Sequence, residues 1–392
     1  MATHSTSPNL ASDLAASSKL VIEAVQAVTH IVEGMHSNIA RLSPPLGKPV
    51  ERKTSGITGF VYRSVRGITQ VVGTALSLGI SQLEPLLRGR AAVPQREALL
   101  SAINGVLGDH LQATDNPLAI PMQLRQNAAP VDAAAQTGGK LLVAVHGLCM
   151  NDQQWLHGEG MLAHNHATAL ARDLGYTPVY LHYNTGLAIA ENGEQFAQQL
   201  QQLVDDWPVP ITELSVLCHS MGGLVSRSAL QIAKAKKHTW PHLLKHLVFL
   251  GTPHHGAPLE RAGSWIDYAL GISPYSAPLA KLGLLRSQGI QDLRHGRVWR
   301  VLADEAAAFG LPARVKCHAV AATRQKAPLD GTTPKRLKGD GLVPVASALG
   351  QHREAEKTLK IPKMRQLLVF DTDHFELLNS REVYEYLVRQ MR

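Results

Sequence analysis

Apolar residues recur every three to four positions through the first 112 residues, interrupted by the proline- and glycine-rich segment RLSPPLGKPVERKTSG (41–56). This period is typical of amphipathic α-helices. It predicts helical stretches at 17–40, at about 57–87 and after Pro94. The third stretch has its apolar positions at Leu99, Leu100, Ile103, Val106, Leu107 and Leu111. We therefore expect an all-helical N-terminal extension over residues 1–112.

From about residue 118 the pattern changes to short apolar runs that alternate with helical ones. Strands are predicted at LAIPMQLR (118–125), KLLVAVHG (140–147), TPVYLHY (177–183), ELSVLCH (213–219), HLVFLGTP (246–253), VKCHAVAAT (315–323) and RQLLVFDT (365–372). Helices are predicted near 161–174 and 192–206, at 221–235 and at the C-terminus. This alternation indicates a mostly parallel sheet with helices on both faces. Residues 255–312 interrupt it with a helix-rich segment, which we expect to be a cap, or lid, inserted into a domain over 113–392.

Composition narrows the class of protein. Hydrophobic residues make up 45% and charged residues 18%, which is typical of a globular chain. The formal charge of +8 favours anionic surroundings, but aromatic residues are few and no nucleic-acid-binding signature is present, so no nucleic-acid partner is expected. Seven Lys and Arg face one Asp between Arg314 and Lys338. We interpret this basic stretch as a solvated loop, with contact to an anionic surface or substrate as the alternative.

The cysteines argue against a metal or disulfide framework. Cys149, Cys218 and Cys317 form no C-x-x-C pair. Free thiols suit a reducing compartment. The first residues lack the pattern of a secretory signal, and no uncharged apolar stretch is long enough to span a bilayer. We expect a cytoplasmic protein with no metal and no cofactor, and keep peripheral contact with the inner membrane open.

The second predicted helix contains Gly59, Gly67, Gly73 and Gly79. Glycine weakens a helix, so close packing against another helix is favoured over docking on a membrane. Arg63 and Arg66 are its only charges before Glu84, too few for a strongly basic face. We expect the N-terminal helices to pack on the main domain, or on a second subunit of a homo-oligomer, and to help shape the entrance to its site.

The segment LCHSMGG places Ser220 between a predicted strand, which ends at His219, and a predicted helix, which begins at Met221. A strand-to-helix elbow strains its central residue and lifts that side chain above the edge of the sheet. The residues two before and two after must be small. Gly222 meets this need, and Cys218 stands where the G-x-S-x-G pattern has its first glycine.

Partners for a serine nucleophile follow other strands. VHGLCMN offers the amide of Leu148 after the turn at Gly147, and Met221 offers a second amide for an oxyanion. KGDGLVP contains Asp340, and DTDHFELL contains His374. Each motif alone has an ordinary reading as a turn or cap. Their order, Ser then Asp then His, at the carboxyl ends of strands predicts a catalytic triad.

Several alternatives stay open at this site. Asp330 is the main rival for the acid, ahead of Asp371 and Asp373. His254 and His255 are interpreted as loop residues beside the site rather than as a metal pair. Substrate contacts are predicted for His146, Gly147 and His219, and for an apolar wall of the cap formed by Trp265, Tyr268, Leu270, Ile272, Tyr275 and Leu279.

The segments HGLCMND, CHSMGGLVSR, FLGTPHHGAPLE, GDGLVP and DHFELL resemble those of bacterial α/β-hydrolase lipases and esterases, in particular those related to the GPI inositol-deacylase-like lipases. The resemblance spans residues 140–380 and does not cover the N-terminal extension. It implies an α/β-hydrolase fold and a serine hydrolase that cleaves esters with an apolar acyl or aromatic group. A thioesterase, amidase or polyester depolymerase with the same triad is the alternative among enzymes. A non-catalytic membrane-docking or scaffold protein is the alternative of another class.

Overall fold

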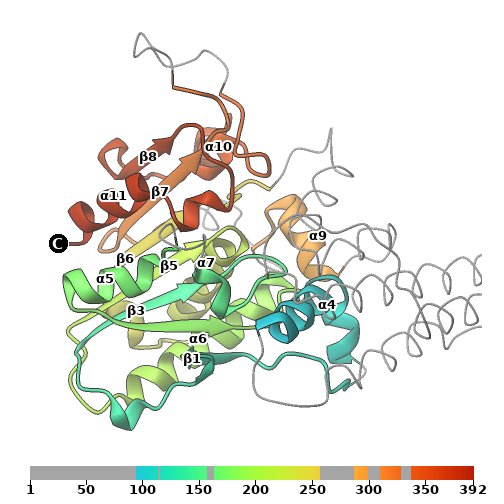
Figure 1. The fold of residues 1–392 in the computed structure, drawn as a ribbon, viewed down its shortest axis with the longest axis vertical. Helices are drawn as coiled ribbons and strands as arrows, with labels where there is room; N and C mark the ends of the chain where they lie inside the picture. Colours follow the sequence, from blue (N-terminus) through green and yellow to red (C-terminus); the bar gives the residue numbers. More distant parts are fainter. Residues whose placement is uncertain (1–93, 114, 157–162, 257–286, 299–309, 328–336) are drawn as a thin grey trace, which may run out of the picture. The chain divides into compact units, whose positions relative to one another are not determined.

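The computed structural model describes residues 94–113, 115–156, 163–256, 287–298, 310–327 and 337–392 (Figure 1). Apart from residues 94–99, these belong to one compact unit, residues 100–269 with 285–392. The first two predicted N-terminal helices and the predicted cap wall, Trp265 to Leu279, lie outside the described residues. So does Asp330.

A sheet of eight strands forms the centre of the described unit, in the order β2-β1-β4-β3-β5-β6-β7-β8. From β4 to β8 all neighbours are parallel, whereas β1 and β2 pair antiparallel at one edge. The mostly parallel sheet is therefore confirmed. The strands are β1 (Gln123–Gln126), β2 (Ala129–Pro130), β3 (Lys140–Val145), β4 (Thr177–His182), β5 (Glu213–His219), β6 (Leu244–Leu250), β7 (Lys316–Ala322) and β8 (Gln366–Val369).

The first strand is shorter than predicted. It begins at Gln123, five residues after the start of the apolar run at Leu118. The amide of Leu118 donates to the side chain of Asn116 at 2.9 Å, and the amide of Ile120 donates to the side chain of Asn104 at 2.9 Å. Side chains therefore take hydrogen bonds that a strand neighbour would otherwise accept.

Helices cover both faces of the sheet (Figure 1). α5 (His166–Leu174) packs with α11 (Arg381–Met391), and α6 (Ile189–Asp206) packs with α7 (Met221–Ala235). The other α-helices among the described residues are α4 (Pro94–Ala113), α9 (Gln288–His295) and α10 (Val345–Ala348). α7 has the predicted bounds, and α4 confirms the helix predicted after Pro94. α5 begins later than predicted, at His166, because Asn165 caps it by accepting from the amides of Ala167 and Thr168.

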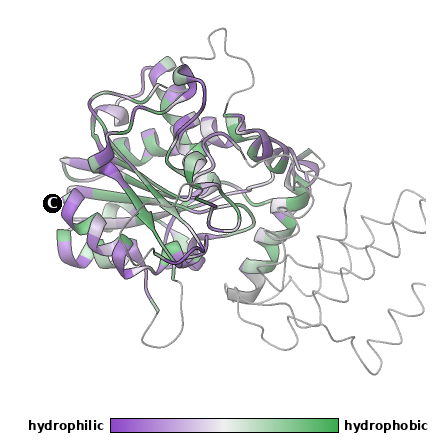
Figure 2. Cartoon of the chain, turned by 90° about the horizontal axis from the view of Figure 1, so that it is seen from above, coloured by the Kyte–Doolittle hydropathy of each residue, from purple (hydrophilic) through white to green (hydrophobic). Residues whose placement is uncertain are grey.

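The central strands are buried on both faces. In β3 the residues Leu141 to Val145 are fully buried, and all seven residues of β5 are buried. Figure 2 shows these strands as largely hydrophobic segments between helices whose outer surfaces are hydrophilic. The continuous apolar runs in the sequence are therefore explained by parallel strands covered on both sides.

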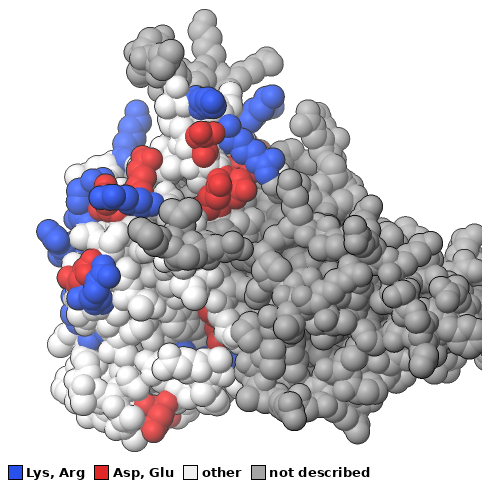
Figure 3. All heavy atoms as spheres, viewed as in Figure 1, with Lys and Arg blue, Asp and Glu red and all other residues white. Residues whose placement is uncertain are grey.

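The described surface mixes charges of both signs. On the face shown in Figure 3, Lys and Arg side chains are interspersed with Asp and Glu. Exposed ion pairs include Lys357 with Glu354 and Arg381 with Glu385, each at 2.8 Å. Among the helices that the structure describes, none has the length and apolar character that a membrane crossing requires.

Two buried histidines lie on neighbouring strands, far from Ser220 in sequence. His246 Nδ1 on β6 and His318 Nε2 on β7 are 3.1 Å apart, and His318 Nδ1 lies 3.2 Å from the hydroxyl of Tyr386. Burial lowers the pKa of His246 to about 4 and the pKa of His318 to about 3, with a further lowering of both by Lys316 and Arg365. Both rings are therefore neutral in the folded protein near pH 7.

We expect the protein to lose stability as the pH falls from 6.5 towards 4. In this window the unfolded histidines, with a pKa of about 6.5, bind protons that the folded ones do not. Each such group lowers the free energy of unfolding by about 1.4 kcal/mol per pH unit. The melting temperature between pH 7 and pH 4.5 checks this. His246→Asn should lower the melting temperature at pH 7 but make its pH dependence shallower, and an equally steep dependence in this variant would contradict the assignment.

Candidate active site

Ser220 occupies the turn between β5 and α7 in a left-handed backbone conformation, with φ 52° and ψ −123°. Its amide donates to the carbonyl of Leu250 on the neighbouring strand at 2.9 Å. A positive φ is strained for any residue other than glycine, and such strain persists only where the surroundings hold it. The predicted elbow is therefore present.

The small residue after the elbow lets α7 approach β3. A Cβ on Gly222 would lie 2.4 Å from the carbonyl oxygen of Val145 and 2.7 Å from that of His146. A side chain at this position would therefore collide with the backbone at the end of β3. The Cys218 thiol donates to Ser226 Oγ at 3.1 Å, and Ser226 Oγ donates to the carbonyl of Gly222 at 2.8 Å. These bonds explain how a thiol fits where the pattern has glycine.

Asp340 and His374 form a buried pair. His374 Nδ1 donates to Asp340 Oδ2 at 2.7 Å, and both side chains are at most 1% exposed. Asp340 Oδ1 accepts from the amides of Leu342 and Val343 at 2.9 and 2.7 Å. The carboxylate is therefore fixed by three donors. With Nδ1 donating, Nε2 of a neutral ring is an acceptor, and it has no hydrogen-bond partner among the described residues.

The carboxylates of Asp371 and Asp373, the rivals that the structure describes, have surroundings other than the His374 ring. Asp373 Oδ1 accepts from the amides of Phe375 and Glu376 at 2.8 and 3.0 Å, so it caps the turn that follows. Asp371 is exposed, with its amide bonded to the carbonyl of Gln325. Within the described ranges, Asp340 is the carboxylate that meets His374.

His219 packs against His374 and forms a hydrogen bond with its backbone. It is fully buried, its Nε2 donates to the carbonyl of His374 at 3.0 Å, and the two rings lie 4.7 Å apart. It is also one of the residues that line a small pocket beside Ser220. Its hydrogen bond also fixes the backbone that carries the candidate base.

The loop after β3 lies against Ser220. A Cβ on Gly147 would be 3.0 Å from Ser220 Cβ and 3.3 Å from His219 Nδ1, so this close approach favours glycine. Leu148 follows and lines the pocket. Met221, the other predicted amide donor, is the first residue of α7 and directly follows Ser220.

A substrate contact was predicted for His146, but its side chain is buried and does not line the pocket. It is fully buried, its ring stacks on Tyr183 at 4.5 Å, and the Tyr183 hydroxyl donates to its carbonyl at 2.8 Å. Its Nδ1 donates to the carbonyl of Gly147 at 3.0 Å. Burial lowers its pKa to about 3. The ring has no surface for a substrate and instead supports the Gly147 turn.

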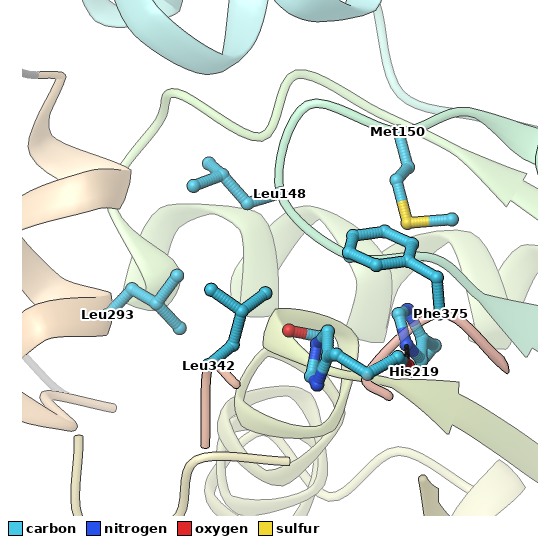
Figure 4. A pocket seen from close by; sticks show the side chains of 9 residues that line it. Leu148, Met150, His219, Leu293, Leu342 and Phe375 are labelled. Carbon is cyan, nitrogen blue, oxygen red and sulfur yellow. Dashed lines mark hydrogen bonds between the residues drawn. The ribbon is translucent and has the colours of Figure 1, made fainter. Parts of the chain in front are cut away.

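A small pocket opens over Ser220, with a volume of about 20 Å³. Figure 4 shows Leu148, Leu293 and Leu342 on one side of it and Met150 beside Phe375 on the other. It is lined by Gly147, Leu148, Met150, His219, Ser220, Leu293, Leu342, His374 and Phe375. The sequence reasoning missed Met150, Leu293, Leu342 and Phe375. For Leu342 and Phe375 the signal was available, because each lies within two residues of Asp340 or His374.

In the part of the chain that the structure describes, no group of three or more His, Cys, Asp and Glu side chains is arranged so that it could hold a metal ion. All three cysteines are free and buried. His254 lies between the ring of Phe249 and Arg227, whose Nη1 is 3.3 Å away, and His255 contacts His352.

The parallel sheet with an antiparallel edge, helices on both faces and a serine elbow between β5 and α7 define the α/β-hydrolase fold. The family described as a domain of unknown function (DUF7379) matches residues 110–292. No curated protein matches the chain.

Three solved structures illustrate what the chain is similar to. Lipase BlEst2 of Bacillus licheniformis, in its mature form, is 19% identical with a TM-score of 0.44 and covers 69% of this chain and 98% of its own. Carboxyl esterase 2 of Tuber melanosporum is 14% identical with a TM-score of 0.40 and covers 65% and 76%. The Pyrobaculum calidifontis esterase is 13% identical with a TM-score of 0.41 and covers 79% and 95%.

Proposed function

We propose that the protein is a carboxylic ester hydrolase, an esterase or lipase, that acts through an acyl-enzyme on Ser220. One observation carries the proposal. His374 is bonded to Asp340 through Nδ1, its Nε2 is left without a partner among the described residues, and it lines the same pocket as the serine on the elbow. A nucleophile, a base and an orienting acid are the groups that acyl transfer needs.

The steps follow from these roles. His374 Nε2 takes the hydroxyl proton as Ser220 Oγ attacks the ester carbonyl. Asp340 holds the ring tautomer and stabilises the imidazolium. The amides of Leu148 and Met221 stabilise the oxyanion. His374 then gives the proton to the leaving alcohol, and a water that it activates releases the acid from Ser220.

The lining of the pocket supports an apolar acyl group. Leu148, Met150, Leu293, Leu342 and Phe375 offer no charge to a substrate. The volume of about 20 Å³ is little more than one water needs, about 10–15 Å³. A short acyl chain is therefore the one that this pocket would admit with the smallest movement of side chains.

A panel of p-nitrophenyl esters tests the proposal. We expect kcat/KM to be highest for acetate to butyrate and to fall for octanoate and palmitate. Leu293→Ala should shift the preference to longer chains, because it removes a buried wall of the pocket. Ile290→Ala is the matched control, since Ile290 lies on the same helix, is equally buried and is not part of the lining.

Three further measurements separate the alternatives. A fluorophosphonate probe should label Ser220 in the wild-type protein, and absence of labelling together with absence of ester hydrolysis would favour a non-catalytic protein. Activity on thioesters, amides or polyesters without activity on the p-nitrophenyl esters would move the protein to another class of acyl hydrolase. Activity on emulsified triglyceride alone would contradict the short-chain preference.

A further inference from the structure

Helix α4 contacts the loop that carries Leu148. A Cβ on Gly105 would lie 2.2 Å from Cys149 Sγ and 3.1 Å from Cys149 Cα. The thiol also lies 3.9 Å from the carbonyl of Ala102 on the same helix. Cys149 directly follows Leu148, so α4 packs on the residue next to the proposed oxyanion donor.

Cys149 holds this loop in a strained conformation. Its φ is 59°, a left-handed value that a side chain other than glycine rarely adopts. Its amide donates to Thr185 Oγ1 at 3.1 Å, which fixes the peptide after Leu148. The peptide before Leu148 is fixed through the carbonyl of Gly147, which accepts from His146 Nδ1 and, at 3.3 Å, from the amide of Met150. Leu148 is thus held from both sides.

Gly105 and Asp109 of α4 also form hydrogen bonds with the start of α9. Ser287 Oγ donates to the carbonyl of Gly105 at 2.6 Å, and the amide of Gln288 donates to Asp109 Oδ2 at 2.8 Å. Ser287 and Gln288 begin the helix that brings Leu293 to the pocket. Gly105 therefore contacts both the loop that carries Leu148 and the start of α9, the helix that carries Leu293.

We propose that α4, from Leu100 onward, is a positioning element of the active site, and that Gly105 sets the place of Leu148 through Cys149. The inference rests on the proposed function. None of these residues reacts with substrate. They act through the amide of Leu148, whose direction must match the developing oxyanion, and small misplacements of such groups reduce turnover strongly.

Gly105→Ala tests this role of Gly105. Alanine favours a helix more than glycine does, and the three atoms nearest to the added Cβ all belong to Cys149, so we attribute an expected loss of turnover to that contact. We expect kcat for a p-nitrophenyl ester to fall about 10- to 100-fold with KM changed little, because the loss concerns transition-state stabilisation. The rate of fluorophosphonate labelling should fall in parallel.

The double variant Gly105→Ala, Cys149→Gly should recover most of the kcat of Cys149→Gly alone. Glycine removes the thiol and adopts φ 59° without strain. Gly108→Ala is the matched control: its Cβ would lie 1.8 Å from Asn184 Oδ1, on the loop after β4. It should lower the melting temperature without being rescued by Cys149→Gly.

Thr185→Val supplies a second test that introduces no larger side chain. It removes the hydroxyl that fixes the Cys149 amide, and we expect kcat to fall several-fold with little change in KM. The inference is overturned if Thr185→Val and a folded Gly105→Ala keep wild-type kcat, or if Cys149→Gly rescues Gly108→Ala equally well. A wild-type protein without esterase activity or probe labelling would overturn the proposed function and this inference with it.

Discussion

Replacing Ser220 by alanine is expected to reduce kcat for ester hydrolysis by about 10⁴-fold or more. Without the hydroxyl there is no atom to form the acyl-enzyme, and the unpartnered Nε2 of His374 has no proton to remove. The fold should be retained, because the backbone bond from Ser220 to Leu250 does not involve the side chain. Alanine keeps the strained φ of 52°, so the melting temperature should stay near that of the wild type.

Two variants separate loss of the hydroxyl from damage to the elbow. Ser220→Gly relieves the strain and should be as inactive as Ser220→Ala. Ser228→Ala makes the same chemical change at a fully buried serine of α7 and should keep turnover. Steady-state kinetics and labelling by a fluorophosphonate probe provide the readout. A well-folded Ser220→Ala protein with wild-type turnover would show that another residue is the nucleophile.

The strands and helices near the site could be predicted because their patterns are local. β5 and α7 have the predicted bounds, since an apolar run and a helical period meet at Ser220. The start of β1 could not be predicted. It depends on Asn104, which lies in helix α4 and whose side chain accepts a hydrogen bond from the amide of Ile120.

The same distinction applies to the site. Asp340 and His374 were predictable, because parallel strands bring their carboxyl ends to one edge of the sheet. The buried position of His146 could not be predicted, because it depends on the stacking of its ring on Tyr183, which follows β4. Leu293 reaches the pocket because α9 is held by Gly105 and Asp109, and no local pattern in the sequence records that contact.

Asp340→Asn is expected to reduce kcat by about 10⁴-fold, the effect of holding the histidine in the wrong tautomer. Asn has nearly the same shape, so its Oδ1 can still accept from the amides of Leu342 and Val343. Its NH₂ group would then face His374 Nδ1 in place of Oδ2. Two donors cannot pair, so the ring would carry its proton on Nε2 and could not accept one from Ser220. KM should change little.

The matched controls are the carboxylates that flank His374. Asp373→Asn removes a negative charge from the cap of the following turn, and Asp371→Asn removes an exposed one, so both should keep most of their turnover. Asp330→Asn completes the set, because Asp330 was the main rival in the sequence. Melting temperatures confirm that each variant is folded. An Asp340→Asn protein with near wild-type kcat, beside an inactive Asp330→Asn protein, would contradict the assignment. Asp330 would then be the acid that orients His374.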